Sequence, residues 1–80
     1  MNADQQRRYL AENIEAHELQ IRLVEEQLAR LRRMRPGARG VASGIAQDER
    51  VLASHQESLA RQRARLAELD AGAPPGRRAA

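Results

Sequence analysis

The stretch LAENIEAHELQIRLVEEQLARL, residues 10–31, decides the fold of this chain. Six apolar residues and one histidine follow one another in this stretch at alternating steps of four and three residues: Leu10, Ile14, His17, Ile21, Val24, Leu28 and Leu31. Such spacing is typical of the seam in a left-handed coiled coil, where two positions in every seven face a partner helix. The stretch is therefore predicted to be an amphipathic helix that needs another helix along one face.

A second stripe with the same spacing follows and supplies that helix. Its members are Ile45, Asp48, Leu52, His55, Leu59, Gln62, Leu66 and Leu69. Between the stripes lies Arg35-Pro36-Gly37-Ala38-Arg39-Gly40, where the residue before proline avoids helical angles and glycine permits a turn. A short link favours antiparallel neighbours. Seam residues whose numbers add up to about 76 should then face each other across the seam.

These patterns predict an all-α fold, a two-helix antiparallel coiled-coil hairpin over residues 1–71. We expect helix 1 at about 4–34, a basic link at about 35–43 and helix 2 at about 44–70. Asn2 and Gln5 have the spacing of a capping box, and Ser43 suits a cap for the second helix. Gly72 and two prolines predict a stop, followed by a disordered tail over 72–80.

Charged residues beside the seam favour the same register. In the predicted hairpin Arg32 lies within reach of Glu49, and Glu18 lies within reach of Arg63. Exposed pairs of this kind contribute less than about 1 kcal/mol each. They are expected to support the register without creating the fold.

The apolar content is small for an independent domain. Hydrophobic residues make up 41% of the 80 residues, but many are alanines, and the chain has no Phe, Trp or Cys. Chains of this size usually need oligomerisation or another staple to bury enough surface. We therefore expect two hairpins to pair into a four-helix bundle as a homodimer. The apolar residues off the seam are candidates for this second interface: Leu19, Leu23 and Val51.

Both histidines occupy seam positions. At the predicted register His17 and His55 fall in different layers, opposite Leu59 and Ile21 respectively. Neither has a second histidine four residues away, and neither belongs to a Glu-x-x-His motif. Three interpretations remain: polar residues that fix register, a pH-sensitive interface, or a metal site between subunits.

Basic charge gathers at the expected hairpin tip. Residues 30–44 carry five arginines and no acid: Arg30, Arg32, Arg33, Arg35 and Arg39. Residues 1–29, in contrast, have a net charge of −3. The tip is a candidate contact for nucleic-acid phosphates or for an acidic protein partner, and arginine in a last helical turn also complements the helix dipole. It contains no aromatic residue to stack on bases.

No pattern in the sequence indicates catalysis, a bound metal, a cofactor or a small-molecule substrate. The first 30 residues lack the apolar core of a signal peptide, no stretch is apolar enough to span a membrane, and the lack of cysteine fits a reducing compartment, so we expect a cytoplasmic protein. The sequence favours a non-catalytic interaction module, an adaptor, small chaperone or scaffold that binds itself and another protein. The alternative is a nucleic-acid-associated accessory protein that uses the arginine-rich tip.

Overall fold

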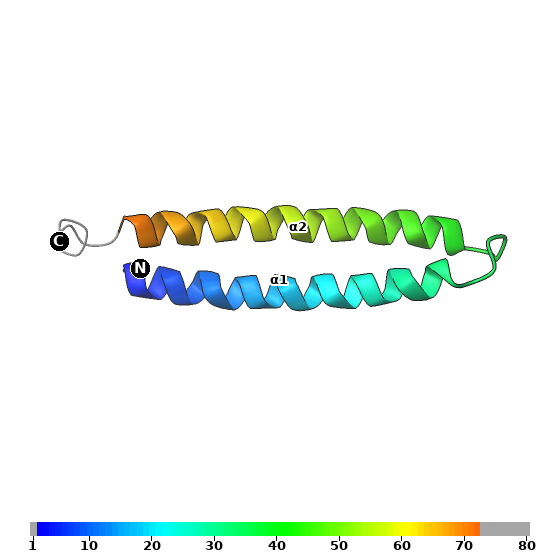
Figure 1. Ribbon diagram of the computed structural model, residues 1–80, viewed down its shortest axis with the longest axis horizontal. Helices are drawn as coiled ribbons and strands as arrows, with labels where there is room; N and C mark the ends of the chain where they lie inside the picture. Colours follow the sequence, from blue (N-terminus) through cyan, green and yellow to red (C-terminus); the bar gives the residue numbers. More distant parts are fainter. Residues whose placement is uncertain (1, 73–80) are drawn as a thin grey trace.

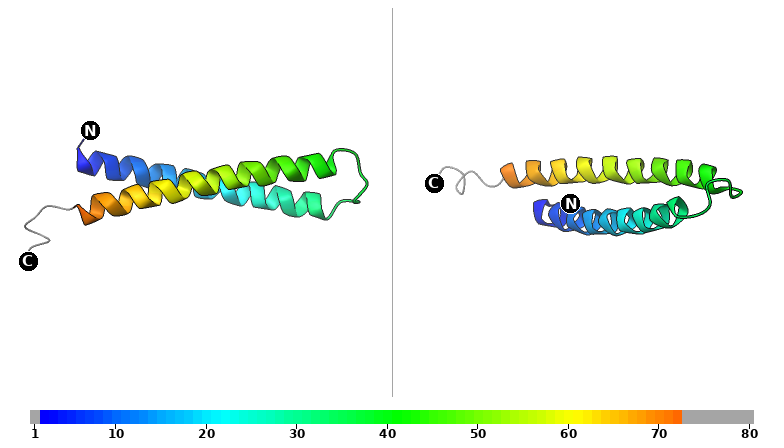
Figure 2. Two further views of the ribbon diagram at one scale, coloured as in Figure 1. Left: turned by 90° about the horizontal axis from the view of Figure 1, so that it is seen from above. Right: turned by 45° about the vertical axis from the view of Figure 1, so that its right-hand side comes forward.

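Two long antiparallel helices joined by a short link make up the fold (Figure 1). The computed structural model describes residues 2–72, with α1 at Ala3–Arg32 and α2 at Val41–Ala71. Each helix is about 45 Å long at 1.5 Å per residue, and the two cross near the middle of their lengths (Figure 2). Residues 2–72 contain no strand. The predicted all-α hairpin is confirmed, and the pairing of two hairpins stays a prediction.

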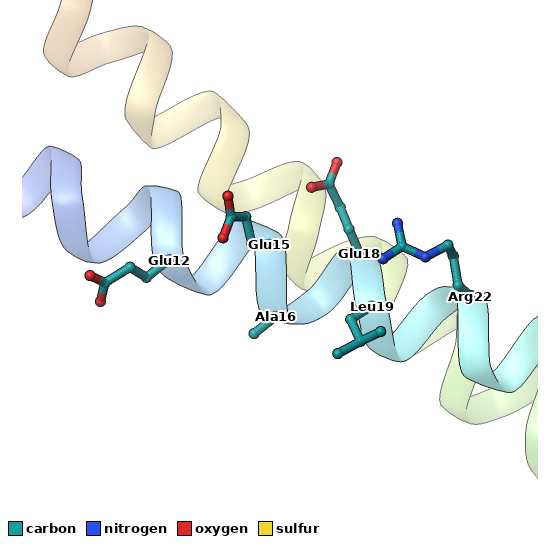
Figure 3. A pocket seen from close by; sticks show the side chains of 6 residues that line it. All are labelled: Glu12, Glu15, Ala16, Glu18, Leu19 and Arg22. Carbon is teal, nitrogen blue, oxygen red and sulfur yellow. The ribbon is translucent and has the colours of Figure 1, made fainter.

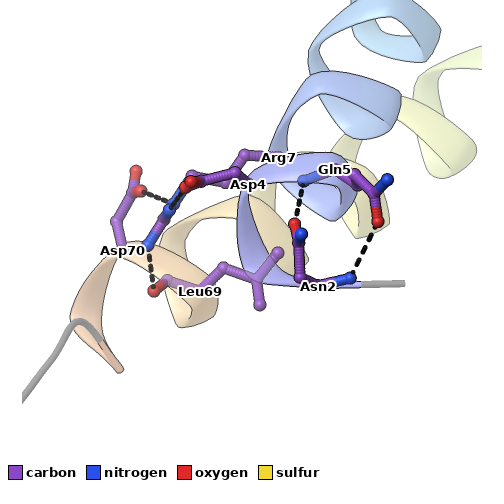
Figure 4. Close-up of polar contacts among 6 residues, drawn as sticks. All are labelled: Asn2, Asp4, Gln5, Arg7, Leu69 and Asp70. Atoms are coloured by element: carbon purple, nitrogen blue, oxygen red, sulfur yellow. Dashed lines mark hydrogen bonds and ion pairs between the residues drawn. The ribbon is translucent and has the colours of Figure 1, made fainter.

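The start of α1 is fixed by its cap. The backbone N–H of Gln5 donates to the side-chain oxygen of Asn2 at 2.8 Å, and the N–H of Asn2 donates to Gln5 Oε1 at 3.0 Å (Figure 4). This is the predicted capping box, which satisfies two N–H groups that the first turn leaves without partners. At the other end Arg30 and Arg32 lie in the last turn, where positive charge complements the helix dipole.

The link lies a few residues earlier than the sequence indicated. It spans residues 33–40 and not about 35–43, because α1 ends at Arg32 and α2 begins at Val41. Gly40 precedes α2 in a left-handed conformation, with φ at 80°, which glycine adopts without the steric cost of a Cβ atom. Ser43 is not the cap of α2: it lies inside the first turn, and its hydroxyl donates to the carbonyl of Gly40 at 3.2 Å.

Gly44 also belongs to α2, although a glycine so close to the link suggested a later helix start. A Cβ atom at this position would lie 3.4 Å from Leu31 Cδ1 on α1. The missing side chain therefore lets the two helices approach closely beside the link. This close contact offsets the conformational entropy that a helical glycine loses on folding.

Few side chains of the hairpin are fully buried. Within residues 2–72 the buried side chains are Leu28, Val41 and Leu59, with exposed fractions of 2%, 5% and 7%. Val41 extends the second stripe by one step and was missing from the predicted seam. The remaining predicted seam residues are half-buried: Leu10, Ile14, His17, Ile21, Val24, Leu31, Ile45, Asp48, Leu52, His55, Gln62, Leu66 and Leu69. The seam thus runs the whole length of the hairpin and stays partly open to solvent.

A backbone hydrogen bond ends the last turn of α2. The N–H of Gly72 donates to the carbonyl of Glu68 at 2.8 Å. The predicted disordered tail, residues 72–80, lies outside the described residues except for Gly72.

Candidate interaction surfaces

One edge of the hairpin carries ion pairs between the helices. Arg32 of α1 lies 3.2 Å from a carboxylate oxygen of Glu49 on α2, and Arg63 of α2 lies 2.7 Å from a carboxylate oxygen of Glu18 on α1. Both predicted pairs are confirmed. Their side chains are largely exposed, so each pair contributes little to stability but favours this register. We call this side of the hairpin the charged edge.

The opposite edge is free of charge over most of its length. Residues seven apart share one side of a helix, and most of those that flank the seam away from the charged edge are uncharged. They are Asn13, Gln20 and Gln27 of α1 and Gly44, Val51 and Ser58 of α2. The next positions outward are Tyr9, Ala16 and Leu23 of α1 and Gln47 and Ser54 of α2. We call these eleven residues the uncharged face. The same rows end in charge, at Arg30, Arg61 and Arg65.

An open hollow lies at the end of this face that is nearer the chain termini, and residues of both α1 and α2 line it. It measures about 370 Å³ and is lined by Gln6, Tyr9 and Leu10 of α1 together with Arg65 of α2. Arg65 follows Ser58 by seven residues and therefore continues the same edge. The contact supports the assignment of faces from the helical spacing.

The exposed apolar residues lie on the uncharged face and beside it. Leu23 and Val51, exposed at 49% and 36%, lie on the uncharged face, as does Tyr9 at 51%. Leu19, exposed at 46%, lies on the outer side of α1 among charged residues (Figure 3). There it lines an open hollow of about 590 Å³ with Glu12, Glu15, Ala16, Glu18 and Arg22. Leu19 and Leu23 lie one helical turn apart, about 40° around α1, and are therefore neighbours on its surface. The second interface of Leu19, Leu23 and Val51 stays a prediction.

The two histidines meet across the seam, about halfway along both helices. Their Nδ1 atoms lie 3.0 Å apart, and the ring centroids lie 5.2 Å apart with an angle of 56° between the planes. His17 and His55 belong to different layers of the seam, as the register predicts, yet their rings touch, which the sequence did not predict. Each layer of the seam has one residue nearer the charged edge and one nearer the uncharged face. Both histidines are of the second kind, so their rings lie on the same side of the seam and come together from adjacent layers. The contact is a hydrogen bond when one Nδ1 carries a proton and the other does not.

Two further polar seam positions hide oxygen atoms without partners. Asp48 Oδ2 and Gln62 Oε1 are buried and accept no hydrogen bond. Buried polar atoms of this kind cost free energy and make a seam selective for register. Within residues 2–72, no cluster of three or more His, Cys, Asp or Glu side chains has the arrangement of a metal site.

All five arginines of the tip are exposed. Arg32 is held by Glu49, whereas the other four form no ion pair: Arg30, Arg33, Arg35 and Arg39. The tip is thus a concentration of positive charge that the rest of residues 2–72 does not neutralise.

The opposite end of the hairpin is closed by one arginine (Figure 4). Arg7 Nε donates to a carboxylate oxygen of Asp70 at 3.1 Å, and its terminal nitrogens donate to Asp4 at 2.8 Å and to the carbonyl of Leu69 at 3.4 Å. This cluster joins the first turn of α1 to the last turn of α2. Arg7 occupies the next seam position before Leu10, but a charged residue was not counted in an apolar stripe, so the sequence did not predict this cluster.

No family model matches this sequence, and comparisons with curated proteins and with solved structures found no match. Neither helix within residues 2–72 combines the length and the apolar character needed to cross a membrane.

Proposed function

We propose that this chain is a non-catalytic protein–protein interaction module of the cytoplasm that acts as a homo-oligomeric helical hairpin, an adaptor, small chaperone or scaffold. The imbalance between buried and exposed apolar side chains carries the proposal. Within residues 2–72 three side chains are buried, while five large apolar ones are exposed: Tyr9, Leu19, Leu23, Met34 and Val51. A two-helix chain of this size gains apolar burial most directly by association.

The polar contacts of the hairpin support an interaction role. The ion pairs of the charged edge favour one register, the capping box and the Arg7 cluster hold the ends, and the hollows are open and lie on the surface. The ion pairs, the capping box and the Arg7 cluster are thus used to hold the hairpin together. Two surfaces, the uncharged face and the tip, stay available for contacts with other molecules.

Sedimentation equilibrium at micromolar concentration tests the proposal. We expect a mass of at least about twice the 9.0 kDa of the chain. A monomer mass for a chain that is fully helical and melts cooperatively would refute self-association. Co-purification from the native host, with and without nuclease, would then separate a protein partner from a nucleic-acid one.

A second candidate function, contact with nucleic acid, is favoured by the four unpaired arginines of the tip. Binding through phosphates releases counterions and should therefore weaken steeply as salt rises. We expect the combined change of Arg32, Arg33, Arg35 and Arg39 to Gln to abolish it, and Arg22→Gln on the outer side of α1 to leave it nearly unchanged. Lack of binding to duplex and single-stranded probes at low salt would reject this candidate.

A further inference from the structure

We infer that two copies of this chain pair in antiparallel orientation through the uncharged face, with the tips at opposite ends of the dimer. The inference rests on the proposed self-association and adds to it the surface and the orientation.

Charge selects the surface. The uncharged face carries exposed apolar side chains from both helices, among them Leu23 and Val51, and charge enters this side of the hairpin only towards its ends, at Arg30, Arg61 and Arg65. Pairing through the charged edge would remove the Glu18–Arg63 ion pair and its neighbours from water, which costs several kcal/mol per ion before any compensation. The amides and hydroxyls of the uncharged face, such as Gln20 and Gln27, can instead hydrogen-bond to their counterparts on the second copy.

The area of this side of the hairpin suits a dimer. Two helices about 45 Å long and about 10 Å apart present a surface about 20 Å wide. Covering the whole side, with the arginines at its ends, would bury roughly 900 Å² on each copy, close to the roughly 800 Å² per partner that is usual for a stable interface. The eleven uncharged residues, which span about 28 Å of α1, supply roughly 560 Å² of this. The half-buried seam residues on this side, Leu10 and Val24 among them, would lose their remaining exposure at the same time.

The tip selects the orientation. Residues 30–44 carry a net charge of +5, and four of the five arginines have no ion pair. A parallel dimer would place two such tips side by side, where like charges repel. An antiparallel dimer separates them by about 45 Å, several times the Debye length of about 8 Å at physiological ionic strength. The two-fold axis then passes near the middle of the hairpin, where His17 and His55 meet.

Distances between paired spin labels test the orientation. Gly37 is suited to a label at the tip, because a Cβ atom there would meet nothing within 4 Å and its φ is not positive. With Gly37→Cys labelled in the full chain, we expect label separations above about 45 Å. Labels on Gln20→Cys, near the axis, should lie within about 30 Å and report the dimer itself.

The outcomes separate this inference from the proposed function. Short distances at both positions mean a parallel dimer, which overturns the inference and leaves self-association standing. A monomer mass with no coupling at either position overturns both.

A matched pair of variants tests the surface. Leu19 and Leu23 have nearly the same exposure. Leu19 points directly away from the seam, and Leu23, one turn further on, is rotated by about 40° toward the uncharged edge. We expect Leu23→Glu to raise the dissociation constant of the dimer at least tenfold, and Leu19→Glu to change it less than threefold, in variants whose helicity is unchanged. A larger effect of Leu19→Glu, or equal effects, would overturn the assignment of the face.

Discussion

Replacing Leu28 by alanine should be among the most damaging single changes in the hairpin. Leu28 is 2% exposed and lies in the seam close to the link. The change removes three carbon atoms, which at about 0.8 kcal/mol per methylene amounts to about 2.4 kcal/mol of lost transfer free energy. The cavity adds to this loss, and buried leucine-to-alanine changes measure about 3–5 kcal/mol. Because a two-helix seam can close around a gap, we expect about 3 kcal/mol.

Thermal unfolding followed by circular dichroism measures the effect. In a domain of 60–100 residues, 1 kcal/mol shifts the melting temperature by about 4–8 °C, so Leu28→Ala should lower it by about 12–24 °C. The matched control is Leu19→Ala, since Leu19 is 46% exposed and alanine is at least as good a helix former. We expect the control to shift melting by less than about 5 °C. Equal shifts for the two variants at one protein concentration would show that the seam is not the core.

Three smaller changes test other contacts. Gly40→Ala should cost about 1–2 kcal/mol in urea unfolding because φ is 80° there, whereas Gly37→Ala should be neutral or slightly stabilising; equal effects would contradict the role of the left-handed turn. Gln62→Leu should raise the free energy of unfolding by about 1–2 kcal/mol, because its buried Oε1 has no partner, and a loss of stability would show that this oxygen is satisfied. A double change of His17 and His55 to Leu removes the contact between their Nδ1 atoms and places apolar side chains at two half-buried seam positions. It should therefore raise the free energy of unfolding, and a loss of stability would show that the contact between the rings stabilises the seam.

The sequence predicted the hairpin because two kinds of pattern agreed. The seven-residue repeat set the faces of both helices, and the register that follows from it placed Arg32 beside Glu49 and Glu18 beside Arg63, as the structure does. Helix ends were predicted less well. The second helix was expected from about residue 44, whereas α2 begins at Val41. The close approach of Leu31 to Gly44 is a tertiary contact that local propensity does not contain.

The candidate surfaces needed three-dimensional information. The register set His17 opposite Leu59 in one layer of the seam. Considering each layer by itself does not reveal contacts between adjacent layers, such as that between His17 and His55. Leu19 and Leu23 lie one turn apart on α1, so their grouping from the sequence stays a prediction. The ion pairs then showed that Leu23 is the nearer of the two to the uncharged edge. The uncharged face was visible only once the ion pairs had shown which edge of the hairpin is charged.

The concentration dependence of thermal unfolding tests the central claim most directly, because association stabilises the folded state by mass action. The melting temperature, followed by circular dichroism from about 1 to 100 μM chain, should rise steadily with concentration. A cooperative melting transition at one temperature over the whole range would contradict self-association and show that the hairpin is stable alone.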